Sequence, residues 1–467
     1  MTDPRDQIDD WLRTEVTPLS PPPGALDRIR RRAGQRKMRR VVVASAGCAV
    51  VLAAALTVPQ LLAGRGSAGG NPPVAGGHTT VTAPAGASAS AGGPGPEGSG
   101  SPQVQLQQRT RLSAGTSGTA PPAHFRPTSV TFVGNGQGGV VGAVIGQAGP
   151  PCANPGICTS LAGTSNYGGS WYGVSAPVAP GPDQVTGVSQ LRFANLHDGW
   201  AYGPALYETT GGGWPWSPVS TGGQQVTALE ASGQTALAVF ATCAASAAGY
   251  AANCTDFTLY SGTAGSTTWS PVTVPAGYQH MSASHPSSVA LVISAGTGYL
   301  LTPSGSVLTG PVSGGPWSVA GPAPCQPGAT QPATGVPQNA QLAASQSQLL
   351  LTCASAPGGG AALYTSAGGT SWQLAGTEPG LGAATGLASA GGSQVVLAST
   401  GGIAYSADDG STWHFATIAG GVPAGGFSYV GMTSPTLGVA VPADPGEGAI
   451  YVTHDGGRTW SKSPITG

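Results

Sequence analysis

The sequence predicts an all-β fold, a seven-bladed β-propeller of four-stranded blades, preceded by one transmembrane helix and a disordered linker. Three observations support this prediction. Short glycine-rich turns that end in tryptophan recur from residue 164 onward, and these tryptophans are evenly spaced. An uncharged apolar run near the N-terminus is followed by a long stretch of glycine, alanine, serine and proline.

The turn motif has two full copies near the C-terminus, SADDGSTW at residues 406–413 and THDGGRTW at residues 453–460. A weaker copy, TSAGGTSW, occupies residues 365–372. Glycine supplies the left-handed backbone of a tight turn, and an Asp carboxylate accepts hydrogen bonds from N–H groups within it. The residues expected to hold these two turns are Ser406, Asp408, Gly410 and Trp413, and Thr453, Asp455, Gly457 and Trp460.

The tryptophans that follow these turns have a regular period. Looser copies of the turn precede five earlier tryptophans, Trp171, Trp216, Trp269, Trp317 and Trp372. With Trp413 and Trp460, the successive gaps by subtraction are 45, 53, 48, 55, 41 and 47 residues. A period of about 40–50 residues is typical of a four-stranded propeller blade, so seven anchors predict seven blades. A β-rich chain with unrelated tryptophans is the alternative.

The pattern S/T-x-D-x-G-x-T-W resembles the Asp-box, or BNR, repeat of the sialidase-like β-propellers. Residues 191–209 also resemble blades of the photosystem-assembly-factor type. The resemblance implies that the motif lies in a turn at the blade periphery. It also implies that a ligand binds at the mouth of the central channel, away from the motif.

The three C-terminal strands of blades six and seven follow from short β-forming runs between glycine-rich turns. We expect strands at 394–399, 403–406 and 412–416 in blade six, and at 438–441, 449–453 and 459–462 in blade seven. In blade one we expect strands at 129–134, 140–145 and 158–162. The turn before Trp317 lacks an acidic residue, which makes blade four the least regular.

Residues 1–40 form a short basic head, with ten Lys or Arg and six Asp or Glu, a net charge of +4. The uncharged run at residues 41–63 is long enough to span a bilayer as a helix. A basic cluster before such a run predicts a cytoplasmic N-terminus and an extracytoplasmic C-terminal part. Its position favours this explanation over nucleic-acid binding, so we expect no nucleic-acid partner. A cleaved signal peptide is the alternative to an anchor.

Residues 64–122 are rich in glycine, alanine, serine, proline and threonine, and have too little apolar content to fold alone. We expect a disordered linker that holds the propeller, residues 123–467, away from the membrane. Within it, residues 104–112 alternate between apolar and polar side chains, and an edge strand that docks on the ring is expected there.

Six cysteines lie within the predicted propeller and form three close pairs along the chain. Nearest-neighbour pairing predicts three disulfide bonds, although six cysteines allow fifteen pairings. The pairs are Cys152 with Cys158, Cys243 with Cys254, and Cys325 with Cys353. Disulfide bonds suit an extracytoplasmic location. No C-x-x-C spacing occurs, so zinc is not expected.

The residues needed for catalysis are sparse. Sialidases use three arginines to bind the substrate carboxylate, but from residue 123 onward only Arg126, Arg192 and Arg458 occur. Other glycosidases need two apposed carboxylates, for which Glu208 and Glu230 are the open pair. The acids of the turn motif are too few for calcium, so each is expected to cap its own turn. We therefore expect no enzyme activity, no cofactor and no metal.

The expected function is that of a membrane-anchored extracytoplasmic binding or scaffold module for a protein, glycan or cell-envelope ligand. A sialidase-like glycoside hydrolase is one alternative. Another is a transmembrane sensor, because a cytoplasmic head before a single anchor resembles the layout of actinobacterial anti-sigma factors. The zinc site of many such heads is absent here, since no His or Cys precedes Cys48.

Overall fold

The structure, a computed structural model, describes residues 111–112, 119–134, 139–148, 159–180, 187–245, 251–283, 289–325, 340–345, 347–353 and 360–466. These residues belong to one compact unit, residues 95–467. Within these ranges no helix is both long and apolar enough to cross a membrane. The predicted head, the anchor at residues 41–63 and most of the linker lie outside them, so those parts stay predictions.

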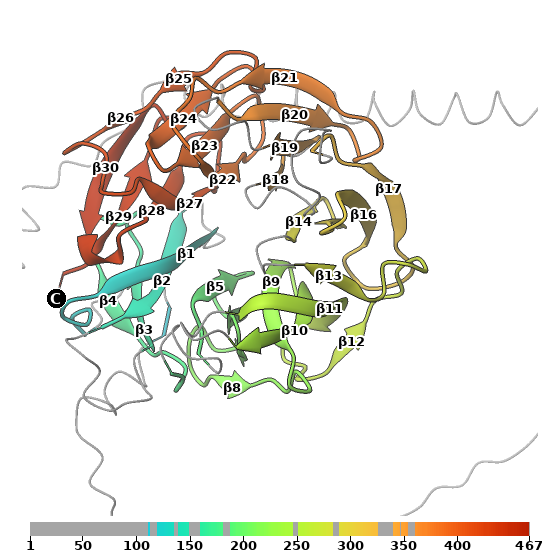
Figure 1. The fold of residues 1–467 in the computed structure, drawn as a ribbon. Helices are drawn as coiled ribbons and strands as arrows, with labels where there is room; N and C mark the ends of the chain where they lie inside the picture. The colour runs from blue at the N-terminus through green and yellow to red at the C-terminus, as the bar shows by residue number, and fades with distance from the viewer. Residues whose placement is uncertain are drawn as a thin grey trace, which may run out of the picture. The chain divides into compact units, whose positions relative to one another are not determined.

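The predicted seven-bladed propeller is confirmed: the described residues form seven sheets arranged as a closed ring (Figure 1). Blade 1 is β1 (Arg126–Gly134), β2 (Val140–Gln147), β3 (Thr159–Thr164) and β4 (Tyr172–Val174). Blade 2 is β5 (Gln190–Phe193), β6 (Gly199–Tyr202), β7 (Leu206–Thr209) and β8 (Ser217–Pro218). Blade 3 is β9 (Gln225–Ser232), β10 (Thr235–Ala245), β11 (Ala251–Thr263) and β12 (Trp269–Pro271), with β13 (Met281–Ala283) added to β11.

The remaining blades follow the same order. Blade 4 is β14 (Ala290–Ser294), β15 (Thr297–Leu301), β16 (Ser306–Pro311) and β17 (Ser318–Pro322). Blade 5 is β18 (Gln341–Ala344), β19 (Leu349–Cys353), β20 (Ala362–Ser366) and β21 (Gln373–Thr377). Blade 6 is β22 (Ala384–Ala388), β23 (Val395–Ser399), β24 (Gly402–Ser406) and β25 (His414–Phe415). Blade 7 is β27 (Phe427–Met432), β28 (Gly438–Pro442), β29 (Ala449–Thr453) and β30 (Thr459–Pro464), and η2 (Pro445–Glu447) lies between β28 and β29.

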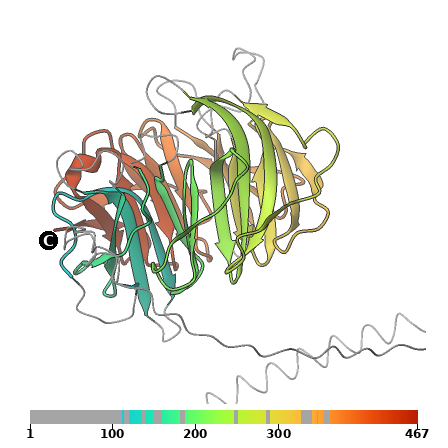
Figure 2. The ribbon, with the colours of Figure 1, turned by 90° about the horizontal axis from the view of Figure 1, so that it is seen from below.

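Each blade is an antiparallel meander whose first strand contacts the first strand of a neighbouring blade around the ring centre. The second strands carry the core: β19, β23 and β28 are buried along their whole length. Both of their faces pack against neighbouring blades, so these strands are nearly continuous apolar runs rather than alternating ones. Figure 2 shows the ring from the side, with the strands running from one of its faces to the other.

Each blade consists of strands that are consecutive in the chain, so no sheet of the described residues combines strands from blade 1 and blade 7. The ring is therefore closed by contacts between side chains of these two blades. One apolar cluster joins blade 1 to blade 7, with Val130 and Val144 on one side and Val439 and Ile450 on the other. In Figure 1 the C-terminal strands (red) accordingly lie beside the first strands of blade 1 (blue-green).

The outer edges of several blades are protected against further strand pairing. In blade 1 the Gly173 N–H donates to the Thr119 carbonyl at 2.7 Å. At the same position of the outer strand, two residues after the anchor tryptophan, blades 2 and 3 carry Pro218 and Pro271, which have no N–H to offer. In blade 7, β26 (Thr417–Ile418) pairs in parallel with β30.

Several predicted boundaries need correction. The fourth strand of blade 6 is only His414–Phe415, shorter than the predicted 412–416, because the turn hydrogen bonds hold Thr412 outside the ladder. The innermost strands of blades 6 and 7, β22 and β27, were not predicted. The edge strand expected at residues 104–112 lies mostly outside the described residues, but Leu112 does dock, with its N–H 2.6 Å from the Gly212 carbonyl of blade 2.

Candidate functional site

The turn motif uses its polar atoms to hold its own backbone. In blade 6 the Ser406 hydroxyl accepts from the Gly410 N–H at 2.8 Å and donates to Asp408 Oδ1 at 2.8 Å. The Asp408 carboxylate accepts from the Thr412 N–H at 2.8 Å and the Thr412 hydroxyl at 2.6 Å. Blade 7 repeats this arrangement with Thr453, Asp455, Gly457 and Thr459 in the equivalent places.

A third turn, in blade 1, achieves the same geometry without an acid. The Thr164 hydroxyl accepts from the Gly168 N–H at 2.9 Å, and Asn166 Oδ1 accepts from the Ser170 N–H at 2.9 Å. The geometry of the turn therefore requires an acceptor oxygen at the third position but not a charge. These turns join third to fourth strands, at the periphery of the ring.

The hydrogen bonds in these turns change the acidity of the two carboxyls. Donation by the Thr412 hydroxyl and N–H, with a further bond from Ser406, lowers the pKa of Asp408 to about 2. Burial opposes the charge of Asp455, but the bonds from Thr459 and Thr453 outweigh it and lower its pKa as well. Both carboxylates are therefore ionised and already engaged, which leaves them poorly suited to proton transfer.

The anchor tryptophans occupy the spaces between blades, but to different depths. Trp460 is 1% exposed between blades 6 and 7, and its Nε1 donates to the Gly457 carbonyl at 3.0 Å. Trp413 packs against the cluster between blades 5 and 6 but is only partly buried. Its Nε1 has no hydrogen-bond partner among the described residues, and neither do those of Trp269 and Trp372. Trp317 is buried, with 4% of its surface exposed. The other two indoles have hydrogen-bond acceptors: Trp171 Nε1 donates to the Ser463 hydroxyl of blade 7, and Trp216 Nε1 donates to the Ser175 carbonyl.

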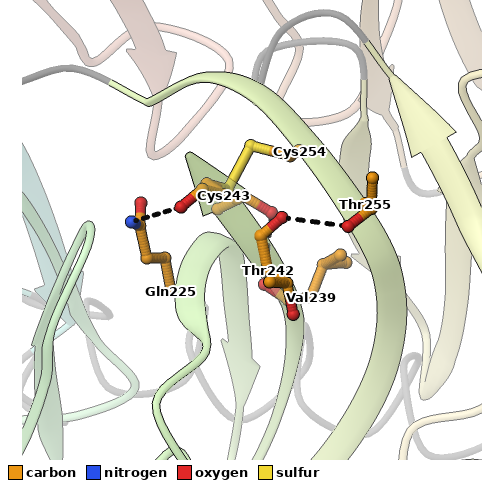
Figure 3. The surroundings of a disulfide bond; sticks show 7 residues. Gln225, Val239, Thr242, Cys243, Cys254 and Thr255 are labelled. Carbon is orange, nitrogen blue, oxygen red and sulfur yellow. Dashed lines mark hydrogen bonds between the residues drawn. A yellow bond between two sulfur atoms is a disulfide. The ribbon is translucent and has the colours of Figure 1, made fainter. Parts of the chain in front are cut away.

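Two of the three predicted disulfide bonds are confirmed. Cys243 and Cys254 face each other across β10 and β11, and Cys325 joins the end of β19 at Cys353. Cys152 and Cys158 lie outside the described residues. Figure 3 shows the first bond, with the Gln225 amide 3.5 Å from the Cys243 carbonyl.

The two faces of the ring differ in construction. We call the face at which second strands end and third strands begin the disulfide face, because both confirmed disulfides lie there. The opposite face, where third strands turn into fourth strands, we call the turn face. On the turn face the connections are short and locked by their own hydrogen bonds. On the disulfide face the connections vary in length: β23 and β24 are joined by a tight turn at residues 400–401, whereas 14 residues separate Cys325 from Ala340.

A central channel of about 870 Å³ runs along the first strands. Its wall mixes polar and apolar residues, and Val292, Ile293 and Met432 are among the partly exposed apolar ones. Three glutamines, Gln190, Gln225 and Gln341, are the first residues of β5, β9 and β18 and so stand at its mouth on the disulfide face. A pocket of this size and composition is typical of a ligand site.

One ion pair lies inside the channel. Arg192 Nε and Nη2 each lie 3.0 Å from Glu230 Oε1, with 17% and 28% of the two side chains exposed. The guanidinium also lies over the Tyr429 ring, 5.7 Å from its centroid. Burial opposes the charge on Arg192, but the attraction of Glu230 outweighs it and raises the pKa of the arginine. Burial also raises the pKa of Tyr202, beside this pair, to about 12.

The remaining candidate catalytic residues do not converge on the channel. Arg126 begins β1 at an exposed position, and Arg458 lies over the Tyr405 ring beside its turn, so no arginine cluster forms with Arg192. Glu208 accepts a hydrogen bond from the Gly265 N–H of blade 3, and burial raises its pKa. Glu208 and Glu230 are therefore engaged with different partners. Among the described residues no group of His, Cys, Asp or Glu forms a metal site.

Comparison with known proteins finds only distant structural likenesses. No family model matches the chain, and no curated protein does. A structure of YCF48 bound to a D1 peptide is similar at 21% identity, over 59% of this chain and 82% of that one, with a TM-score of 0.41. YCF48 from Cyanidioschyzon merolae is 14% identical over 59% and 84%, with a TM-score of 0.42. The GH74 xyloglucanase from Xanthomonas campestris is 14% identical over 69% and 62%, with a TM-score of 0.22.

We infer nothing about a ligand from these likenesses, because their TM-scores lie below 0.5 and their identities are low. Of the residues that line the channel, the sequence marked only Arg192 and Glu230, as candidates for catalysis. The first strands carry no turn motif that marks them. The one sequence feature that could have indicated a channel residue is a polar residue at the start of a short apolar run, as at Gln341.

Proposed function

We propose that the chain is a membrane-anchored binding or scaffold module that presents the disulfide face of its propeller to a protein, glycan or cell-envelope ligand. The observation that carries this proposal is the contrast between the two faces. The turn face is locked by repeated hydrogen bonds, whereas the disulfide face combines some long connections, such as the one after Cys325, with covalent bracing and the mouth of the channel. Binding residues are commonly found on loops positioned by a rigid scaffold.

A capture experiment tests this function. Tagged full-length chain, purified in detergent, is incubated with envelope fractions, and the bound material is identified. Thr255→Arg places a charge at an exposed position beside the disulfide in β11, and Ala407→Arg places the same charge on the turn face. The proposal expects loss of capture with the first variant only. Equal capture by both variants, or loss with Ala407→Arg alone, overturns it.

The proposal includes the anchor at residues 41–63, with the head in the cytoplasm and the propeller outside. Protease added to intact, wall-stripped cells is expected to remove the propeller and leave the head. A protected propeller with a cleaved head would reverse the orientation. The turns fit the Asp-box class in this proposal, since their hydrogen bonds serve the turn itself.

We also propose that the chain does not hydrolyse glycosides, because the channel holds a single arginine that is already paired with a single glutamate. Purified full-length chain is expected to leave a fluorogenic sialoside intact. Turnover that is lost with Arg192→Ala would show the opposite.

A further inference from the structure

We propose that the central channel binds an uncharged, extended peptide segment with small apolar side chains, which enters through the mouth on the disulfide face. The proposal rests on the function proposed above and names the ligand class for that face. It is carried by the hydrogen-bonding groups, the charge and the wall of the channel.

The mouth of the channel offers amide groups. The side chains of Gln190 and Gln341 are partly exposed and make no hydrogen bond to any described residue. Gln225, on a third blade, is held only by a long contact of 3.5 Å to the Cys243 carbonyl. A glutamine amide provides a carbonyl acceptor and two N–H donors. These are the groups that a peptide backbone, itself alternating C=O and N–H, can satisfy in pairs.

The ion pair deeper in the channel also has hydrogen-bond donors and an acceptor that are not yet used. Arg192 uses Nε and Nη2 on Glu230 Oε1, and Nη1 on the Leu191 carbonyl. A guanidinium has five N–H groups, so donors remain. Glu230 Oε2 makes no hydrogen bond to any described residue. A neutral amide group can therefore accept from Arg192 and donate to Glu230 without breaking the pair.

The net charge of the channel selects against charged ligands. Arg192 and Glu230 are the two charged residues in its described lining, and their charges cancel. An anion or a cation would have to compete with one member of the pair and leave the other partly desolvated and unpaired, which is costly. The ligand that fits is neutral.

The wall of the channel favours a peptide over an oligosaccharide. Its partly exposed apolar contributors include Val292, Ile293, Ala344 and Met432, against which small apolar side chains can be buried. Of its two tyrosines, Tyr202 is 4% exposed, and the Arg192 guanidinium lies over one face of the Tyr429 ring. Among the described lining residues these are the two aromatic rings on which a sugar could stack, and they offer it little open surface.

The experiment uses full-length chain in detergent and a defined pool of short, N-acetylated, C-amidated peptides built from Gly, Ala, Ser, Val, Leu and Gln. A second pool carries one Asp or Lys in each peptide, and a third set of ligands contains uncharged oligosaccharides of glucose and N-acetylglucosamine. Binding is measured by fluorescence polarisation of labelled members. The expected result is saturable binding of the uncharged peptides, at least about tenfold tighter than the charged ones.

Two matched variants locate the site on one blade. Gln341→Trp narrows the mouth from the inner strand of blade 5, and Gln373→Trp makes the same change on its exposed outer strand. Peptide affinity is expected to fall about tenfold or more with the first and to stay unchanged with the second. An equal effect of both variants, preference for charged peptides, or oligosaccharide binding that Gln341→Trp removes would each overturn the proposal. If no peptide binds while envelope capture persists, the channel inference fails and the proposed function stands.

Discussion

The indole Nε1 of Trp171 in blade 1 donates to the hydroxyl of Ser463 in blade 7 at 3.0 Å, across 292 residues of sequence. The same hydroxyl donates to the Gly168 carbonyl, in the turn of blade 1. Ser463 is 7% exposed. One side chain from the last strand thus satisfies two groups of the first blade, and these two bonds supplement the apolar cluster that closes the ring.

Ser463→Ala is therefore expected to lower the free energy of unfolding by about 1–3 kcal/mol, because it leaves a partly buried indole N–H and a carbonyl without their partner. Chemical denaturation of the purified chain measures this. Ser461→Ala, at an exposed position two residues earlier, is the control and should change little. Equal effects of the two substitutions would show that the Ser463 hydroxyl does not contribute to ring closure.

The acidic turns predict a specific pH dependence. A carboxyl whose folded pKa is lowered stabilises the fold above its ordinary pKa, and that contribution is lost as the pH falls through the folded value. For Asp408 the window lies between its ordinary 3.8 and about 2. Replacing Asp408 and Asp455 by Asn, as blade 1 does with Asn166, keeps an acceptor oxygen but removes the charge.

The melting temperature of the wild-type chain is thus expected to exceed that of the double Asn variant near pH 5, and the gap is expected to shrink as the pH falls toward 2. The double Ala variant is expected to have a lower melting temperature than the double Asn variant at every pH, because no acceptor remains for the Thr412 N–H. A gap between wild type and the Asn variant that does not change with pH would contradict this account of the two carboxylates.

The anchor tryptophans are not equivalent. Trp460→Ala is expected to lower the free energy of unfolding by about 3–5 kcal/mol, because it leaves a cavity in a fully buried site. Trp460→Phe should also destabilise, because the Gly457 carbonyl loses its donor. Trp413→Phe should cost less, since the Trp413 Nε1 has no partner to lose. Urea denaturation of the two Phe variants compares them directly, and a larger loss for Trp413→Phe would contradict the assignment.

The disulfide prediction extends beyond the two confirmed bonds. Peptide mapping without reduction is expected to recover links between Cys243 and Cys254, between Cys325 and Cys353, and also between Cys152 and Cys158. Reduction should lower the melting temperature, because two of these bonds brace the disulfide face. Free thiols at these positions in native protein would argue against both the pairing and an oxidising compartment.

The outer half of each blade was the most predictable part of the fold. Asp408, Gly410 and Trp413 mark a turn and the strand beside it, because their chemistry is local: a carboxylate, a left-handed glycine at φ 88° and a large ring. The period of the tryptophans then gave the blade number. The two confirmed disulfides followed from the closeness of their cysteines along the chain.

The inner half was less predictable. First strands such as β22 and β27 owe their place to neighbours on other blades, so no local pattern separates them from loops. The pairing of Arg192 with Glu230 depends on the juxtaposition of blades 2 and 3, which depends in turn on ring closure. In the sequence the two residues are separate candidates for catalysis, and no local pattern indicates that they neutralise each other.

The central claim is that the disulfide face of the propeller, not the turn face, contacts the ligand. Hydroxyl-radical footprinting of full-length chain, alone and with its captured envelope partner, measures this most directly. The account predicts that the ligand protects Tyr278 and His280 from oxidation, because both precede β13 and lie near the start of β11 on the disulfide face. It predicts no change in the oxidation of His414, on the outer strand of blade 6, or of His454, on the turn face of blade 7. Protection of His414 and His454 without protection of Tyr278 and His280 would contradict it.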